Sequence, residues 1–178
     1  MSEVPFVLQV VFDCPSARLL AEFYRELLGY RYRSGDEPPA TGEPDPRDWL
    51  VLVPEGADRG SGRGLAFQQV TDYVPPEWST SVPSSEQIRR QMLHLDMGVP
   101  DFDSLVRQRD RAVGLGASIL FDRSADDEEP LYVFADPAGH PFCIFVADPG
   151  PNENGGDADA RILERSGDYV DFDGLFGD

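Results

Sequence analysis

Cysteine, basic side chains and long apolar runs are all scarce in this chain of 178 residues. Its two cysteines, Cys14 and Cys143, are too few for the disulfide framework that stabilises small secreted domains. No apolar run approaches the roughly 20 residues of a membrane-spanning helix. Residues 1–5 lack the basic and apolar regions of a secretory signal. We therefore expect a cytoplasmic protein that does not interact with membranes.

The low number of basic residues leaves the chain strongly acidic. It carries 33 aspartates and glutamates against 15 lysines and arginines, a formal net charge of −18. A surface of this sign repels nucleic-acid phosphates and anionic lipids, so we expect no nucleic-acid partner. The charge also favours solubility and does not identify a substrate.

The composition changes near residue 147. The preceding length fits one domain, predicted over residues 1–147, whereas 148–160 is rich in Pro, Gly, Asn and Asp. Residues 148–178 are therefore predicted to be an acidic extension. It is compatible with a mobile tail, and its apolar residues Phe172 and Phe176 are equally compatible with docking on the domain or on a partner.

Before that point, the apolar pattern describes the same order of elements twice. An amphipathic stripe with helical spacing predicts a helix over 16–28, and a similar pattern predicts another over 102–115. Short runs rich in β-branched and aromatic residues predict strands around them. The predicted strands are 6–14, 30–33, 49–53, 65–70, 92–99, 118–121, 131–135 and 141–147. The fold class is therefore α+β, with two βαβββ modules at roughly 5–72 and 91–147.

A short internal match supports this repeat. QVVFDCP at residues 9–15 aligns with HLDMGVP at residues 94–100. Both segments begin with a polar residue, end with proline and precede a predicted helix. A repeat of this kind determines the architecture of the whole domain.

Four segments carry a resemblance to a known superfamily. They are DCPSARLLAEFYRELLGY, LAFQQV, MLHLDMGVPDFDSL and YVFADPAGHPFCIF, in this order. The chain resembles the glyoxalase-like branch of the vicinal-oxygen-chelate (VOC) superfamily, the glyoxalase/bleomycin-resistance/dioxygenase type, over about residues 5–147. The resemblance implies that the two modules enclose a central cavity for a small molecule. Because many relatives form dimers, it also implies a homodimer.

The resemblance further implies where a metal would bind. Metal-using relatives place four ligands on the first and last strands of each half. Three of these positions fall at Gln9, His94 and Cys143. The fourth falls at Phe67 or Gln68, and alternation of side chains along the strand favours Gln68 as the residue that faces the cavity.

This set contains no carboxylate. Hard divalent ions prefer carboxylate and carbonyl oxygens, and zinc, which accepts imidazole and thiolate, is poorly served by two amides. We therefore predict that the cavity binds a small apolar or aromatic molecule without a cofactor or catalytic metal. The predicted ligand-binding residues are Gln9, Trp49, Gln68, Trp78, His94, Asp96, Tyr132, Cys143 and Phe145.

Two enzymatic alternatives stay open. In the first, a metal-dependent lyase, isomerase or dioxygenase keeps Gln9 and His94 as ligands of a divalent ion, and Asp96 replaces the missing acid. In the second, Cys143 is a nucleophile with His94 as its base and Asp96 as the orienting acid. His140, in the turn at 136–140, is predicted to be a surface residue without a catalytic role.

Overall fold

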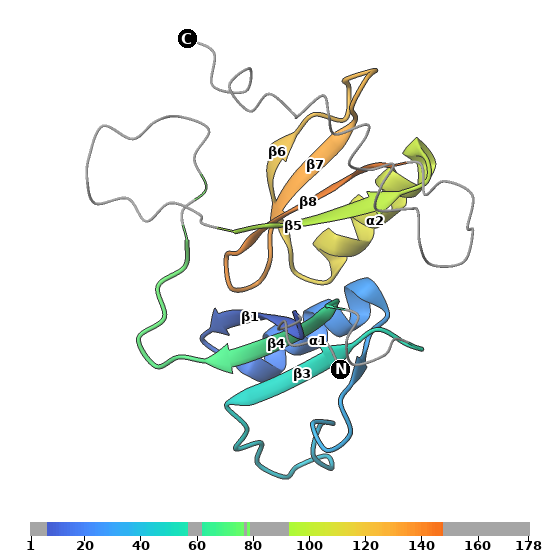
Figure 1. The fold of residues 1–178 in the computed structure, drawn as a ribbon. Coiled ribbons are helices and arrows are strands. Elements are labelled where there is room, and N and C mark those ends of the chain that lie inside the picture. Colours follow the sequence, from blue (N-terminus) through green and yellow to red (C-terminus); the bar gives the residue numbers. More distant parts are fainter. Residues whose placement is uncertain (1–6, 57–61, 77, 79–92, 148–178) are drawn as a thin grey trace. The chain divides into compact units, whose positions relative to one another are not determined.

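The structure of the chain is a computed structural model that describes residues 7–56, 62–76, 78 and 93–147. Within these ranges it contains eight strands and two helices (Figure 1). In chain order they are β1 (Gln9–Cys14), α1 (Ala17–Leu28), β2 (Arg31–Tyr32), β3 (Trp49–Val53), β4 (Gly64–Gln69), β5 (Leu95–Val99), α2 (Phe102–Gly114), β6 (Ser118–Asp122), β7 (Leu131–Ala135) and β8 (Pro141–Val146).

The strands form two sheets with the same topology. The first has the order β1-β4-β3-β2 and the second the order β5-β8-β7-β6. In each sheet the first strand of the module runs parallel to the last, as β1 does to β4 and β5 to β8. Strand, helix and three further strands thus occur twice, which confirms the α+β class and the two βαβββ modules.

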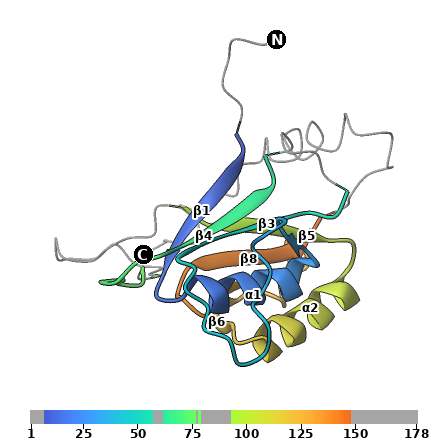
Figure 2. The same ribbon diagram turned by 90° about the horizontal axis from the view of Figure 1, so that it is seen from below.

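Helix α1 has sequence signals at both ends and an apolar stripe between them. The side chain of Ser16 accepts a hydrogen bond from the backbone N–H of Leu19, as an N-cap does. The helix ends at Gly29, whose φ of 67° is the left-handed conformation that glycine adopts readily. The helix lies against β1, β3 and β4 of the first sheet (Figure 2). Its buried side chains are Ala17, Leu20, Ala21, Phe23, Tyr24 and Leu27.

Three aromatic rings define the side of the first sheet that faces α1. Phe12 of β1 packs against Tyr24 of α1 and Phe67 of β4, with ring centroids 5.3 and 5.8 Å apart. Tyr24 and Phe67 are stacked at 5.7 Å. Because side chains alternate along a strand, Gln68 points to the opposite side of the sheet from Phe67.

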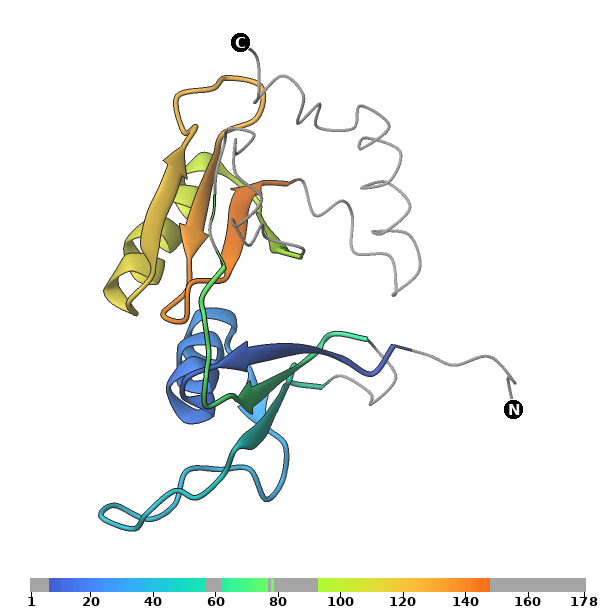
Figure 3. The same ribbon diagram turned by 90° about the vertical axis from the view of Figure 1, so that its left-hand side faces the viewer.

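In the second sheet, the corresponding side is covered by α2 (Figure 3). Phe134 of β7 stacks on Phe142 of β8 at 5.1 Å, and Tyr132 lies beside Phe134. The guanidinium group of Arg109 in α2 lies 5.7 Å from the centre of the Tyr132 ring. These three aromatic residues therefore share the α2 side of the sheet, and their neighbours in sequence point away from it.

The chain divides into two compact units that differ slightly from the predicted halves. The first unit contains the described residues up to 75 together with 111–118 and 135–140, and the second contains the other described residues. The end of α2 and the turn at 136–140 thus group with the first unit, although both are in the predicted second half. Neither described helix has the length and apolar character that a membrane crossing requires. The predicted extension at 148–178 lies outside the described residues.

Candidate functional site

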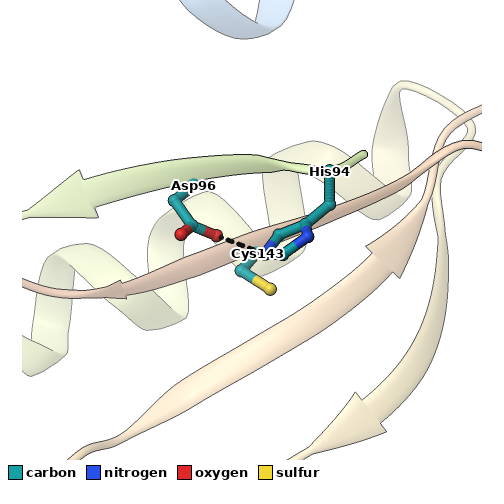
Figure 4. Close-up of side chains that lie close together, drawn as sticks. All are labelled: His94, Asp96 and Cys143. Carbon is teal, nitrogen blue, oxygen red and sulfur yellow. Dashed lines mark ion pairs between the residues drawn. The ribbon is translucent and has the colours of Figure 1, made fainter. Parts of the chain in front are cut away.

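Three side chains that can bind a metal or a polar ligand converge in the second unit. The imidazole of His94, the carboxylate of Asp96 and the thiol of Cys143 each offer an atom, and these atoms all lie within 4.8 Å of one another (Figure 4). We call this group the His–Asp–Cys cluster.

Strand geometry explains why these residues meet. Asp96 in β5 is the direct register partner of Cys143 in β8. His94 precedes Asp96 by two positions, the repeat at which side chains return to the same side of an extended chain. Its Nε2 atom lies 3.2 Å from Oδ1 of Asp96.

The cluster combines an exposed carboxylate and a half-buried imidazole with a buried thiol. The side chain of Asp96 is 59% exposed and that of His94 is 31% exposed, whereas Cys143 is only 8% exposed. Burial raises the pKa of the Cys143 thiol to about 12, and the nearby carboxylates of Asp96 and Glu129 add to the effect. The thiol is therefore protonated at neutral pH, so this environment does not activate Cys143 as the nucleophile of the second alternative.

The cluster lies on the side of the second sheet that faces away from α2. Cys143 follows Phe142 and so points to the opposite side, which it shares with the half-buried Phe145. Gly98, the register partner of Phe145, has no side chain to cover the ring. We refer to this surface, formed by the cluster, Gly98 and Phe145, as the open face.

Tyr132 does not belong to the open face. It is 2% exposed, and its hydroxyl accepts a hydrogen bond of 3.5 Å from Arg109 of α2. The structure therefore separates Tyr132 from Cys143, because successive strand residues point to opposite sides and Tyr132 packs with the core aromatics. Its predicted contact with a ligand stays a prediction.

The first unit holds three other residues from the predicted site. Trp49 and Gln68 are cross-strand neighbours in β3 and β4. Gln9 is opposite Gly64, whereas Gln68 is opposite Asp13, four positions further along the same pair. At about 3.3 Å per residue, about 13 Å of strand separates the positions of the two glutamines. The structure therefore brings Gln68 to Trp49 and not to Gln9.

The registers of the two parallel strand pairs indicate which residue of the first half corresponds to Cys143. In the internal match, Val11 corresponds to Asp96. Val11 is opposite Ala66, and Asp96 is opposite Cys143. By this alignment the counterpart of Cys143 is Ala66, two positions before Gln68. A contact between Gln68 and a ligand stays a prediction. In this alignment, the methyl group of Ala66 occupies the position that corresponds to the thiol of Cys143 in the second half.

The structure describes Trp78, but it does not describe the residues on either side of it in the sequence. Its indole Nε1 is buried and has no hydrogen-bond partner among the described residues. Residues 77 and 79–92 lie outside the described ranges. The predicted contact between Trp78 and a ligand stays a prediction.

A polar network surrounds Asp136 in the first unit and was not predicted from the sequence. The buried carboxylate accepts hydrogen bonds from the hydroxyl of Tyr24 at 2.9 Å and from the backbone N–H groups of Ala138 and His140 at 2.8 and 3.0 Å. The Nδ1 atom of His140 is 3.0 Å from the same carboxylate. His140 is therefore no ordinary surface residue, and its spacing of four from Asp136 within one turn was the available signal.

The donor set of the His–Asp–Cys cluster decides which metal it suits. Nitrogen, oxygen and sulfur together match zinc, whereas magnesium, manganese and calcium prefer oxygen ligands. Ligand atoms on one tetrahedral zinc ion lie about 3.3–3.8 Å apart, from metal–ligand distances of about 2.0–2.3 Å. The His94–Asp96 separation of 3.2 Å is already close to this range, and the limit of 4.8 Å for the whole group requires modest side-chain rotation.

Comparison with known proteins agrees with this architecture. Two βαβββ modules with identical sheet order define the glyoxalase/bleomycin-resistance/dioxygenase class of fold. The sequence matches the family described as Glyoxalase-like domain over residues 9–145. The chain belongs to this family, within the VOC superfamily. No curated protein matches the chain.

Solved structures show the same fold at low sequence identity. A glyoxalase/bleomycin resistance protein/dioxygenase family enzyme from Burkholderia phytofirmans PsJN is similar with a TM-score of 0.54 and 11% identity, over 80% of this chain and 98% of that one. The hypothetical protein SA1046 from S. aureus gives 0.52 and 10%, over 82% and 100%. A glyoxalase/bleomycin resistance protein/dioxygenase from Nocardioides gives 0.50 and 15%, over 87% and 93%.

Proposed function

We propose that this chain binds a small organic molecule on the open face of the second unit. The observation that carries the proposal is the convergence of His94, Asp96 and Cys143 beside Phe145 on the side of the sheet that α2 does not cover. Ligand sites combine apolar surface with a few polar groups that set orientation. The same combination is present here, on β5, on β8 and on His94, which directly precedes β5.

The chemistry of the open face indicates the class of ligand. The half-buried ring of His94 and the exposed carboxylate of Asp96 can donate to and accept from an oxygen-bearing group. Phe145, the register partner of Gly98, offers an aromatic surface for an apolar ligand. The expected ligand is therefore an apolar or aromatic molecule with one polar end.

A fragment screen by protein NMR tests this proposal. The full chain, treated with EDTA, is titrated with aromatic acids and amides, and backbone shifts are followed at Gly98 and Phe145. We expect affinity to fall at least fivefold in Asp96→Asn and in Phe145→Leu. Asp72→Asn, which changes an exposed aspartate in the first unit, is the matched control and should bind as the wild type does. Fragments that bind all four proteins equally, or that shift only other residues, would contradict the proposal.

A metal-dependent reaction at the same cluster is the second candidate function. It is favoured by the donor set, because His94, Asp96 and Cys143 fit one borderline-soft cation. Such an ion would supply a Lewis acid that polarises a substrate oxygen. The chain's own residues would hold it, while Phe145 would orient an apolar substrate. That Gln9 of the first unit is also a ligand of the metal stays a prediction.

Chelation separates the two candidates. A binding protein keeps its ligand affinity in EDTA, whereas a metal-dependent lyase, isomerase or dioxygenase loses turnover and regains it when one cation is restored. Self-association, proposed from the resemblance alone, is tested independently by sedimentation of the full chain over a range of concentrations. A single species at the monomer mass would exclude a stable dimer.

A further inference from the structure

The buried carboxylate of Asp136 needs a positive charge beside it. Its side chain is fully buried, and every group in contact with it is a hydrogen-bond donor, the pattern that an ionised carboxylate requires. Among the residues that the structure describes, His140 is the one cationic side chain in ion-pair contact with it, at 3.0 Å. Because an unpaired buried charge is costly, Asp136 favours a protonated His140.

The hydroxyl of Tyr73 indicates the same charge state independently. It lies 2.8 Å from the carbonyl oxygen of Ala138 and 3.2 Å from Nε2 of His140. A phenol has one proton to donate and a carbonyl oxygen can only accept, so the shorter contact takes that proton. Nε2 must then donate to the phenol oxygen, while Nδ1 donates to Asp136. An imidazole with protons on both nitrogens is positively charged.

The side chains that α1 and β1 contribute to this network are uncharged at neutral pH. Burial and the carboxylate of Asp136 raise the pKa of Tyr24 in α1. Phe12 in β1 packs edge to face with the ring of His140, with centroids 5.1 Å apart. Burial raises the pKa of Cys14 in the same strand to about 11, so it is present as the thiol. Neither element therefore supplies a second positive charge to the network.

The phenol of Tyr73 stays a hydrogen-bond donor over the same pH range. Burial raises its pKa, and the acidic groups Asp136, Cys14 and the exposed Asp13 add to the rise. Histidine is the side chain that gains or loses charge near neutral pH. His140 is therefore the member of the network whose proton can change how Tyr73 is held.

We infer that Asp136, His140 and Tyr73 form a proton-controlled latch, which holds the segment 70–76 after β4 to the turn at 136–140 while His140 is protonated. When the Nε2–H bond breaks, the proton leaves to solvent, and the electron pair stays on Nε2, which becomes an acceptor. Tyr73 then faces two acceptors with one proton, so it keeps one of its two hydrogen bonds. Asp136 loses its counter-charge in the same step. The latch lies in the first unit and is independent of the proposed ligand site.

The sign of the pH dependence follows from this linkage. The folded chain prefers the protonated His140, so the stabilisation is fully present below about pH 6.5, where histidine in an unfolded chain ionises. It is lost as the pH rises through the range in which His140 releases its proton.

Nitrogen NMR of the imidazole rings tests the charge state in the unmodified chain. The sequence contains two histidines, His94 and His140, so isotope labelling of histidine gives few ring signals. At pH 7, we expect both ring nitrogens of His140 at the positions of a protonated imidazolium. They should move to the positions of a neutral ring in Asp136→Asn. In His94→Gln, the matched control that also assigns the signals, they should stay in place.

Urea denaturation between pH 5.5 and pH 8.5 tests the contribution of the latch to stability. The ratio of the folding equilibrium constants of the wild type and His140→Gln should fall about tenfold over this range. Tyr73→Phe should weaken folding about fivefold more at pH 5.5 than at pH 8.5, because it removes one further hydrogen bond at the lower pH. Tyr30→Phe is the matched control, since its hydroxyl has no hydrogen bond within the described ranges, and its effect should be the same at both pH values.

Backbone NMR relaxation at residues 71–74 shows whether the segment itself is released. In the wild type, these residues should become more mobile as the pH rises, and in His140→Gln they should be equally mobile at both ends of the range. A neutral His140 in the wild type at pH 7 would overturn the inference. So would a pH-independent cost of Tyr73→Phe, or mobility at 71–74 that is the same at both pH values in the wild type. Ligand binding enters none of these measurements, so a failure of the proposed function would leave the latch untouched.

Discussion

Loss of the Tyr24 hydroxyl should destabilise the protein by a predictable amount. Tyr24→Phe keeps the buried ring and removes the hydrogen bond of 2.9 Å to the carboxylate of Asp136. Because the Asp136 side chain is fully buried, the lost bond is one to a charged acceptor, which contributes about 1.5–3 kcal/mol. The remaining donors from Ala138 and His140 keep the carboxylate partly satisfied. We therefore expect a loss of about 2 kcal/mol in the free energy of unfolding.

Thermal and urea denaturation measure this loss. For a chain of this size, 1 kcal/mol shifts the midpoint by about 2–4 °C, so Tyr24→Phe should lower Tm by about 4–8 °C. The urea midpoint should fall with an unchanged slope. Tyr30→Phe is the matched control, since no hydrogen bond to its hydroxyl is seen among the described residues, and it should change the free energy of unfolding by less than about 0.5 kcal/mol.

A double-mutant cycle makes the test specific to the Tyr24–Asp136 pair. In the Asp136→Asn background, the acceptor is no longer charged, and the cost of Tyr24→Phe should fall to about 1 kcal/mol or less. If Tyr24→Phe unfolds within 1 °C of the wild type, or if its cost is the same in both backgrounds, the reasoning about the buried carboxylate is refuted.

Three further predictions concern the thiols and the aromatic core. Because the pKa of Cys143 is raised from 9.0 to about 12, its thiolate fraction at pH 8 is about a thousandfold below that of an ordinary cysteine. Iodoacetamide reacts with the thiolate, so it should label Cys143 slowly in the native chain and rapidly in urea. Burial likewise raises the pKa of Cys14 to about 11. The folded state prefers both thiols protonated, so their contribution to stability should be fully present below about pH 9 and be lost as pH rises toward 11–12, which urea titrations at several pH values would reveal. Phe134→Ala should cost about 3–5 kcal/mol in the same assay, because the ring is fully buried and stacked on Phe142; a loss below 1 kcal/mol would contradict that packing.

The order of elements was predictable because local signals agree with the fold. The apolar run Trp49–Val53 is strand β3 to the residue, and the helical stripe ending before Gly29 is α1. The repeated order of elements predicted two modules, the internal match at 9–15 and 94–100 supported them, and the identical order of the two sheets confirms them. These features depend on neighbours within one element, where spacing carries the information.

The site was less predictable because it depends on pairing between strands. The alternation of side chains predicts that Gln68 and Phe67 point to opposite sides of the sheet. Alternation does not determine the position along the strand, and the strand register places Ala66 at the position that corresponds to Cys143. The contact between Tyr24 and Asp136 joins residues 112 positions apart, and no local pattern encodes it. Asp96 was included in the predicted site because it is two residues from His94 on the same strand. That it lies next to Cys143 follows only from the register between β5 and β8.

The matching order of the two sheets has a practical consequence for experiments on this protein. Each position of the His–Asp–Cys cluster has a counterpart on an equivalent strand of the same chain: Gln9 for His94, Val11 for Asp96 and Ala66 for Cys143. The first module thus has the same strand order as the second but lacks its acid and thiol at the corresponding positions. Isotope labels placed on both modules would show in a single sample whether a ligand shifts the resonances of the second module alone.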